Sequence, residues 1–234
     1  MVQLRSGLAR LAGSYKFAKM RQLATRTARI RDYYARHPVV KLNIGCGPIV
    51  RSGWLNIDID PRLDGAIYMD ATQPLPLRDS SVDIAYSEHM IEHVPLESAL
   101  AMLRELHRVL RPSGRLRIAT PDMDNILHLK HDRPDSRELD YIRWSNEEFG
   151  GQLERTAPQN PCYAVNRMFH EWGHRFIYDR ATLASIITEA GFRDVRFCEI
   201  GQSDIPELRD LERHGTSIGE EFNQIETMIA EAFR

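Results

Sequence analysis

Residues 39–60, VVKLNIGCGPIVRSGWLNIDID, constrain the fold of this chain more than any other stretch. Residues 39–44 are mostly β-branched and apolar, as in a buried parallel strand, and Gly45 and Gly47 then interrupt the run. Glycines at these two places allow a sharp turn and the close approach of a ligand to the backbone. A second strand ends at Asp58, whose carboxylate can accept hydrogen bonds from both hydroxyls of a ribose. The stretch therefore predicts a nucleotide-type site at the edge of a parallel sheet.

The residue after this turn bears on the kind of nucleotide. A dinucleotide fingerprint requires Gly or Ala at position 50, where a helix must pack closely on the strand and hold a pyrophosphate. This chain has Val50 there. A ligand without a pyrophosphate needs only the first turn and the ribose acid, so the pattern disfavours NAD.

Four segments together resemble the class I S-adenosylmethionine-dependent methyltransferases. LNIGCGP resembles their motif I, WLNIDID carries the ribose acid, VDIAYSEHMIEHV resembles motif IV, and RVLRPSGRLRI resembles the element around their fifth strand. The resemblance covers residues 39–125 and implies a Rossmann-like fold with S-adenosylmethionine as cofactor. The predicted cofactor-binding residues are Asn43, Gly45, Cys46, Gly47, Asp58, Ile59, Asp70, Ala71, Ser87 and Glu88.

Some of these residues have a second interpretation. Asn43 stands where the family usually has Asp or Glu, although an amide can also accept and donate hydrogen bonds. Cys46 is interpreted as a small side chain that fits the turn. Ser87 and Glu88 either line the donor site or form an exposed loop pair.

Two gaps in the pattern are too short for helices. Residues 48–53 and 61–65 separate predicted strands, whereas a parallel crossover normally takes a dozen or more residues. We expect the N-terminal helix to cover the sheet face left bare, with Leu4, Leu8 and Leu11 on its apolar stripe.

The predicted fold is α/β: a doubly wound, mainly parallel Rossmann-like sheet with an antiparallel last strand, abridged first crossovers and an N-terminal helical arm. The arm, a basic amphipathic helix with breaks, spans residues 1–37 and packs on a methyltransferase domain of residues 38–234. Residues 122–176, rich in His, Asp, Arg and aromatics, are predicted to form an inserted lid. Residues 220–234 fit an amphipathic helix, but IETMIAEAF at residues 225–233 resembles an antiparallel last strand, and the strand is favoured.

Composition and charge limit the partners. The chain is 42% hydrophobic and 27% charged, its three cysteines lack metal-type spacing, and no apolar run spans a bilayer, so we expect a cytoplasmic protein. Residues 1–36 carry nine of the 31 Lys and Arg against Asp32 alone, which gives this arm a charge of +8. Docking on the acidic body is favoured, and peripheral membrane contact remains open. No RNA-binding module supports a nucleic-acid substrate, and the oligomeric state is undetermined.

Two histidine patterns compete with this interpretation. His170, Glu171 and His174 match H-E-x-x-H, and residues 89–93 match the inverted H-x-x-E-H pattern of zinc hydrolases. Gly173 interrupts the helix that the first pattern needs, and the second directly follows a strand, so we predict no metal site.

The histidines are instead suited to general acid–base catalysis. An alcohol or phenol that accepts a methyl group must lose a proton, which requires a base of near-neutral pKa. His89, at the carboxyl end of a strand, is the first candidate, followed by His170 and His174 in the lid; His93 and Glu92 are interpreted as capping and packing residues. We expect O-methylation of a small-molecule or saccharide-like acceptor. The alternatives are a zinc-dependent hydrolase and a non-catalytic, membrane-associated protein of the same fold.

Overall fold

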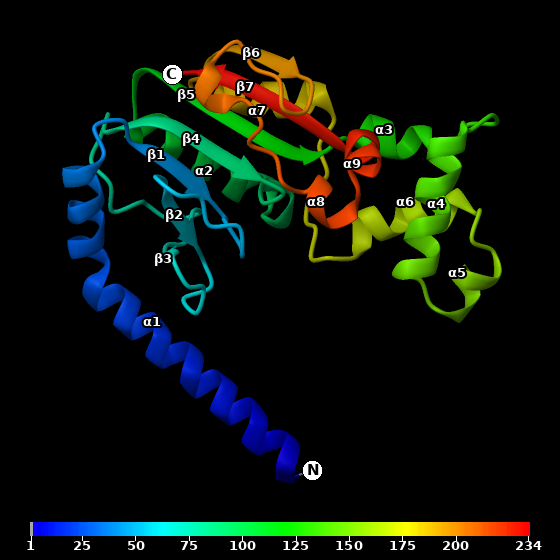
Figure 1. The fold of residues 1–234 in the computed structure, drawn as a ribbon, viewed down its shortest axis with the longest axis horizontal. Coiled ribbons are helices and arrows are strands. Elements are labelled where there is room, and N and C mark those ends of the chain that lie inside the picture. The colour runs from blue at the N-terminus through cyan, green and yellow to red at the C-terminus, as the bar shows by residue number, and fades with distance from the viewer. Residues whose placement is uncertain (1) are drawn as a thin grey trace.

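The computed structural model describes residues 2–234, with side chains from residue 13 onward. These residues form a seven-stranded sheet of order β3-β2-β1-β4-β5-β7-β6 (Figure 1). The strands are β1 Lys41–Ile44, β2 Leu55–Asp58, β3 Ile67–Tyr68, β4 Val82–Glu88, β5 Leu110–Pro121, β6 Arg193–Cys198 and β7 Thr227–Phe233. Strands β1 to β5 pair in parallel, and β7 runs antiparallel to both β5 and β6. The predicted fold class is confirmed.

The helices lie in three groups around this sheet (Figure 1). They are α1 Val2–Arg36, α2 Leu96–Val109, α3 Met123–His128, α4 Ser136–Glu148, α5 Gln152–Thr156, α6 Pro161–His170, α7 Arg180–Glu189, α8 Gly215–Ile218 and α9 Glu220–Glu226, with short 3₁₀ turns η1 Ile91–His93 and η2 Pro206–Leu208. Helices α2 and α7 bury their apolar faces in the main core against the sheet. Helices α3 to α6 gather beyond the carboxyl ends of β4 and β5, around a smaller core of their own.

Helix α1 covers the edge of the sheet where the crossover helices are missing. Within the described chain, residues 48–54 and 61–66 contain turns and no helix. Ile30 and Tyr33 are buried in the main core, and the Tyr33 hydroxyl donates to the carbonyls of Lys41 and Gly53 at 3.0 Å. The helix is unbroken from Val2 to Arg36, so the expected breaks are wrong. The predicted leucine stripe lies outside the described side chains.

The face of the sheet opposite α2 carries a row of polar side chains. From β2 to β7 the register aligns Asn56, Asn43, Tyr86, Arg117 and Glu231. In place of a helix, the segment that follows β6 covers this row, with Leu208 and Leu211 packed on Tyr86. Arg117 is fully buried and is bound by Glu212 of that segment at 2.8 Å and by Glu231 of β7 at 2.5 Å.

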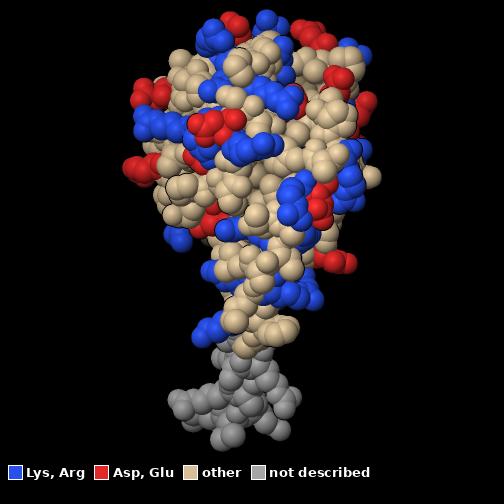
Figure 2. All heavy atoms as spheres, turned by 90° about the vertical axis from the view of Figure 1, so that its left-hand side faces the viewer, with Lys and Arg blue, Asp and Glu red and all other residues tan. Residues whose placement is uncertain are grey.

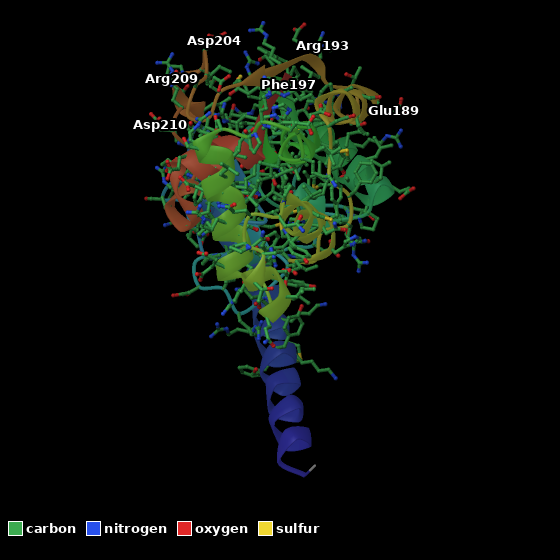
Figure 3. All side chains as sticks on the ribbon, turned by 90° about the vertical axis from the view of Figure 1, so that its right-hand side faces the viewer. Glu189, Arg193, Phe197, Asp204, Arg209 and Asp210 are labelled. Atoms are coloured by element: carbon green, nitrogen blue, oxygen red, sulfur yellow. The ribbon has the colours of Figure 1, made fainter. Side chains whose placement is uncertain are left out.

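The C-terminal segment combines the two structures that the sequence allowed. Residues 220–226 form α9, and residues 227–233 form the antiparallel strand β7, so the strand predicted over 225–233 is confirmed and begins two residues later. Strand β6 lies at the opposite end of the molecule from the N-terminus of α1, with Arg193 and Phe197 on it and Asp204 nearby (Figure 3). Among the helices formed by residues 2–234, none combines the length and the hydropathy of a membrane span.

Candidate functional site

The turn after β1 owes its shape to two glycines and one carboxylate. Gly45 and Gly47 adopt φ values of +62° and +51°, in the region that side chains rarely occupy. The Gly47 amide donates to Asp58 Oδ2 at 2.8 Å, and the Cys46 amide donates to the carbonyl of Ile57 at 3.1 Å. The turn is therefore tied to the end of β2, as the sequence pattern requires.

We expect Gly45→Ala to destabilise the protein. A Cβ at Gly45 would lie 2.3 Å from Met90 Cγ, and the positive φ adds at least about 1 kcal/mol for a residue with a side chain. Gly13→Ala is the matched control, because Gly13 lies inside α1 with nothing within 4 Å of the added Cβ and should gain up to about 1 kcal/mol of helix propensity. Urea unfolding measures both. Equal stability of Gly45→Ala and the wild type would contradict the strained, crowded turn.

A cavity of about 420 Å³ lies between the glycine turn and the ends of β2 and β3. This large cavity is lined by Gly45, Asp58, Ile59, Met69, Asp70, Ala71, Thr72, His89, Met90, His93 and Val94. Both oxygens of Asp58 accept backbone amides, from Gly47 and Asp60, and each keeps a lone pair for a further donor. Asp70 Oδ1 accepts from the amide and the hydroxyl of Thr72. Five predicted cofactor residues thus meet around one space: Gly45, Asp58, Ile59, Asp70 and Ala71.

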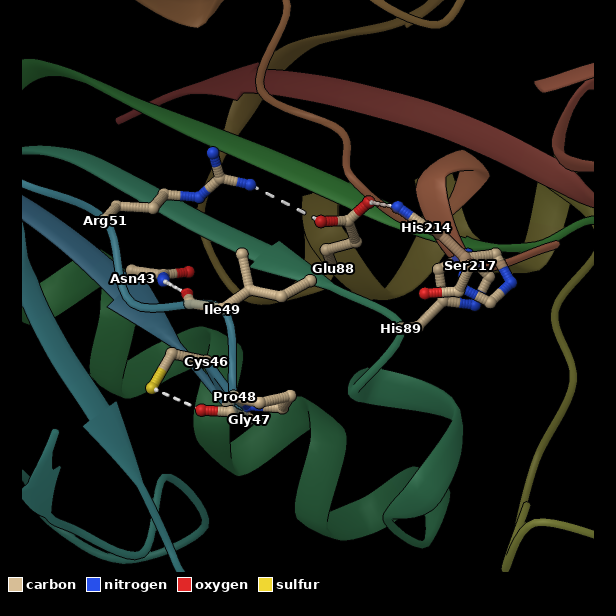
Figure 4. A pocket seen from close by; sticks show the side chains of 11 residues that line it. Asn43, Cys46, Gly47, Pro48, Ile49, Arg51, Glu88, His89, His214 and Ser217 are labelled. Atoms are coloured by element: carbon tan, nitrogen blue, oxygen red, sulfur yellow. Dashed lines mark hydrogen bonds and ion pairs between the residues drawn. The ribbon is translucent and has the colours of Figure 1, made fainter. Parts of the chain in front are cut away.

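A second, smaller cavity of about 180 Å³ is also lined by Gly45, and Figure 4 shows its lining side chains. This turn cavity contains the predicted residues Asn43, Cys46, Gly47 and Glu88. Asn43 donates to the Asn56 side chain at 2.9 Å, so its amide braces the turn. Burial raises the pKa of the Cys46 thiol to about 12, which keeps it protonated at neutral pH.

The last predicted pair lies at the end of β4. Glu88 accepts the backbone amides of Arg213 and His214 at 2.6 and 2.8 Å and receives Arg51 at 3.4 Å, which anchors the loop before α8 to the sheet. Ser87 is fully buried beside it, and its hydroxyl has no hydrogen-bond partner among the described residues.

His89 lies where the large cavity, the turn cavity and a third pocket meet. Its Nδ1 is 3.2 Å from the buried carboxylate of Glu92, its Nε2 is 3.0 Å from the Thr227 hydroxyl, and its ring stacks on His214. Burial alone would lower the pKa of His89, but the hydrogen bond and charge of Glu92 outweigh burial and raise it above its ordinary value. His89 is therefore biased towards the imidazolium form.

His93, one turn further on, has the opposite electrostatic character. It lines the large cavity and the third pocket, and its ring meets His174 edge-on at 4.9 Å between centroids. Burial, together with the neighbouring His174 and His89, lowers the pKa of His93 in spite of Glu92. This imidazole is neutral at pH 7 and able to accept a proton.

The third pocket, called the aromatic pocket from here on, has a volume of about 160 Å³ and is lined in part by residues of α4 and α6. Its lining residues are His89, Glu92, His93, Pro121, Trp144, Phe149, Met168, Trp172, His174, His214, Ile218 and Glu226. Phe149 makes edge-to-face contacts with Trp144 and Trp172, at 5.3 and 5.4 Å between centroids. The pocket thus has aromatic walls and a floor of imidazoles and carboxylates.

The H-E-x-x-H segment does not adopt the geometry of a zinc site. Helix α6 ends at His170, and Glu171 is already in extended backbone, so the two histidines do not share a helical face. His170 is exposed, whereas His174 donates from Nδ1 to the Met168 carbonyl at 2.6 Å and turns its ring towards His93. Of the two lid histidines predicted for catalysis, only His174 reaches the aromatic pocket.

Sequence reasoning missed three residues on the floor of this pocket. The sequence favours a packing role for His93, because a histidine that begins a helix is more often a capping residue than a base. His214 and Glu226 come from the segment after β6 and pair at 2.7 Å, but no motif marks them in the sequence. Only the packing of that segment against β4 and β5 brings them to the site.

The fold, the glycine turn and the acid-lined cavity are those expected of a Rossmann-like protein with a nucleoside site at the carboxyl end of its sheet. Residues 42–118 match the family model described as a methyltransferase domain. Over these residues the match confirms the resemblance to the class I S-adenosylmethionine-dependent methyltransferases, and S-adenosylmethionine is the cofactor of this class.

Two kinds of relatives agree with this assignment. Probable S-adenosylmethionine-dependent methyltransferases from two strains of Mycobacterium tuberculosis are each 32% identical to this chain over 145 residues. The alignment covers 62% of this chain and 38% of each relative, so the chain spans well under half of their length. A methyltransferase structure from Mesorhizobium loti superposes with a TM-score of 0.50 at 16% identity, over 85% of this chain and 92% of the other. At that identity the structure shows the fold alone.

Proposed function

We propose that this chain transfers a methyl group from S-adenosylmethionine to an oxygen atom of a ring-shaped small molecule or saccharide-like acceptor. The observation that carries the proposal is the junction of two spaces: the large cavity and the aromatic pocket share His89 and His93. A nucleoside in one and an acceptor in the other would meet beside two imidazoles.

The large cavity fits the cofactor by its chemistry. Asp58 offers lone pairs to ribose hydroxyls, and Asp70 and Ala71 border the space for the base. In the neighbouring turn cavity, an added Cβ at Gly47 would meet nothing within 4 Å, so the backbone there is open to a ligand. When bound, S-adenosylmethionine supplies a methyl group on a positively charged sulfur, already activated for displacement.

The aromatic pocket supplies the acceptor's position and a base. Flat faces of Trp144 and Trp172 suit a ring stacked between apolar walls, and the polar floor suits its hydroxyls. His93, neutral at pH 7, takes the proton from the acceptor hydroxyl at a ring nitrogen as the oxygen attacks. His174 positions that ring, and His89 with Glu92 supplies a fixed charged pair beside the reacting groups.

Calorimetric titration with S-adenosylhomocysteine tests the donor half. We expect the wild type to bind it and Asp58→Ala to lose about 100-fold in affinity, since hydrogen bonds to a charged group contribute about 1.5–3 kcal/mol. Asp64→Ala is the matched control, an exposed acid on the next loop that lies outside the large cavity.

The structural role of Asp58 needs its own measurement, because its carboxylate also holds the Gly47 amide. Thermal unfolding of the same variants shows whether the loss comes from the ribose contact or from collapse of the turn. Absence of any heat of binding in a folded wild type would refute the donor site. If the protein methylates an amine in preference to every hydroxylated ring in a panel of acceptors, O-methylation is refuted. The donor site would not be affected by that result.

A further inference from the structure

A separate pocket, remote from the reacting groups, lies where α1 meets the loop after β2. This arginine pocket has a volume of about 320 Å³ and is lined by Arg21, Gln22, Thr25, Arg29, Arg62, Leu63, Asp64 and Gly65. Buried Gln22 forms one wall, and its side-chain amide donates to the Ala66 carbonyl at 3.2 Å. The pocket is thus held by the same contacts that dock α1 on the sheet.

Positive charge dominates this pocket. Arg21, Arg29 and Arg62 face one lining carboxylate, Asp64, and Arg62 is neutralised by Asp60 at 2.7 Å. Arg29 donates to the Gln22 side chain at 2.5 Å and to the Ala66 carbonyl at 3.0 Å, which fixes its guanidinium at the pocket wall.

The positive charges of the two guanidinium groups on α1 also repel each other. Burial, and then the charge of Arg21, lowers the pKa of Arg29, with only Asp64 acting in the opposite direction. A partly desolvated cation beside a second, exposed cation gains from an anion between them.

We propose that the arginine pocket binds a phosphate group, held by the guanidinium forks of Arg21 and Arg29. Arginine offers paired N–H donors that match phosphate oxygens, whereas an apolar ligand would leave these donors unpaired. The phosphate belongs either to a free phosphate ester or to the headgroup of an anionic lipid.

The surface beside the pocket bears on the source. Phe17, one helical turn before Arg21, is 71% exposed, and Met20 is 70% exposed. Lys and Arg side chains flank residues without charge along the projecting part of α1 (Figure 2). Residues 13–36 hold seven Lys and Arg against Asp32, so a second copy of this helix would be repelled and an anionic surface attracted.

The first experiment titrates the full chain with inorganic phosphate by calorimetry. We expect saturable binding that weakens about tenfold in Arg21→Ala and is unchanged in Arg31→Ala, which removes the same charge from an exposed position outside the pocket. S-adenosylhomocysteine titration of each variant verifies an intact fold. No saturable binding, or equal loss in the two variants, overturns the proposal.

The second experiment separates the two sources by sedimentation with vesicles of phosphatidylcholine alone or with phosphatidylglycerol. Recruitment to the anionic vesicles that falls in both Arg21→Ala and Phe17→Ser identifies a lipid headgroup. Phosphate binding that depends on Arg21, without recruitment to either vesicle, identifies a free phosphate ester. Recruitment that ignores Arg21 and depends equally on Arg31 means a general charge effect and counts against the pocket.

Discussion

Replacing Arg117 with methionine is expected to lower the free energy of unfolding by about 3–5 kcal/mol, because it leaves two carboxylates buried without their partner. Arg117 is fully buried, donates to Glu212 at 2.8 and 3.0 Å and to Glu231 at 2.5 Å, and also donates to the Gln202 carbonyl. Burial alone would lower the pKa of Arg117, but the two carboxylates outweigh it and raise that pKa, so the guanidinium stays charged.

Two further variants separate charge from shape in this prediction. Arg117→Lys keeps the charge but cannot form the paired bonds to Glu212, so an intermediate loss is expected. Combining Arg117→Met with Glu212→Gln and Glu231→Gln removes the unpaired charges and should recover part of the stability. Denaturant unfolding measures each variant, and a loss below about 1 kcal/mol in Arg117→Met would mean that the network contributes little.

The same network connects the sheet to the site. Glu212 immediately precedes the residues whose amides bind Glu88, and Arg51 donates to the Leu211 carbonyl. Through these contacts the loop before α8 places His214 on the ring of His89. A folded Arg117→Met protein should therefore also carry a disturbed aromatic pocket.

Local signals predicted the glycine turn of this molecule well. Gly45 and Gly47 needed φ values that few residues adopt, and Asp58 followed one strand later, so three positions defined the turn, its strands and the acid that holds it. The gaps after β1 and β2 are too short to hold crossover helices. They therefore predicted the position of α1, since a sheet edge without crossover helices must be covered by another segment.

The polar lining of the aromatic pocket could not be predicted from the sequence, because long-range packing forms it. His214 and Glu226 lie more than 120 residues from His89 in the sequence, and single polar residues in or before short helices carry no periodicity. Asn43 illustrates the same limit within a recognised motif: its register with Asn56 and Tyr86 makes it part of a polar row across the sheet, a role visible only once the strands are paired.

Replacing His93 with glutamine is expected to lower kcat about 10²–10³-fold with little change in S-adenosylhomocysteine affinity, because the change removes the base and leaves the acidic side of the large cavity intact. His170→Gln is the matched control: an exposed histidine of the same chain, expected to retain full activity. Steady-state rates with any acceptor found in the panel, together with calorimetry, measure both quantities.

The pH profile decides which imidazole accepts the proton. The groups that face His93 are Glu92 and His89 on its own side and His174 across the pocket, and their combined effect with burial lowers its pKa. A base with a lowered pKa is neutral at pH 7, so kcat/KM should be flat above pH 6.5 and fall only as the pH drops through the lowered value. His89, with its raised pKa, would instead place the fall above pH 6.5. A profile of that second kind, retained in His93→Gln and abolished in His89→Gln, would transfer the role of base from His93 to His89.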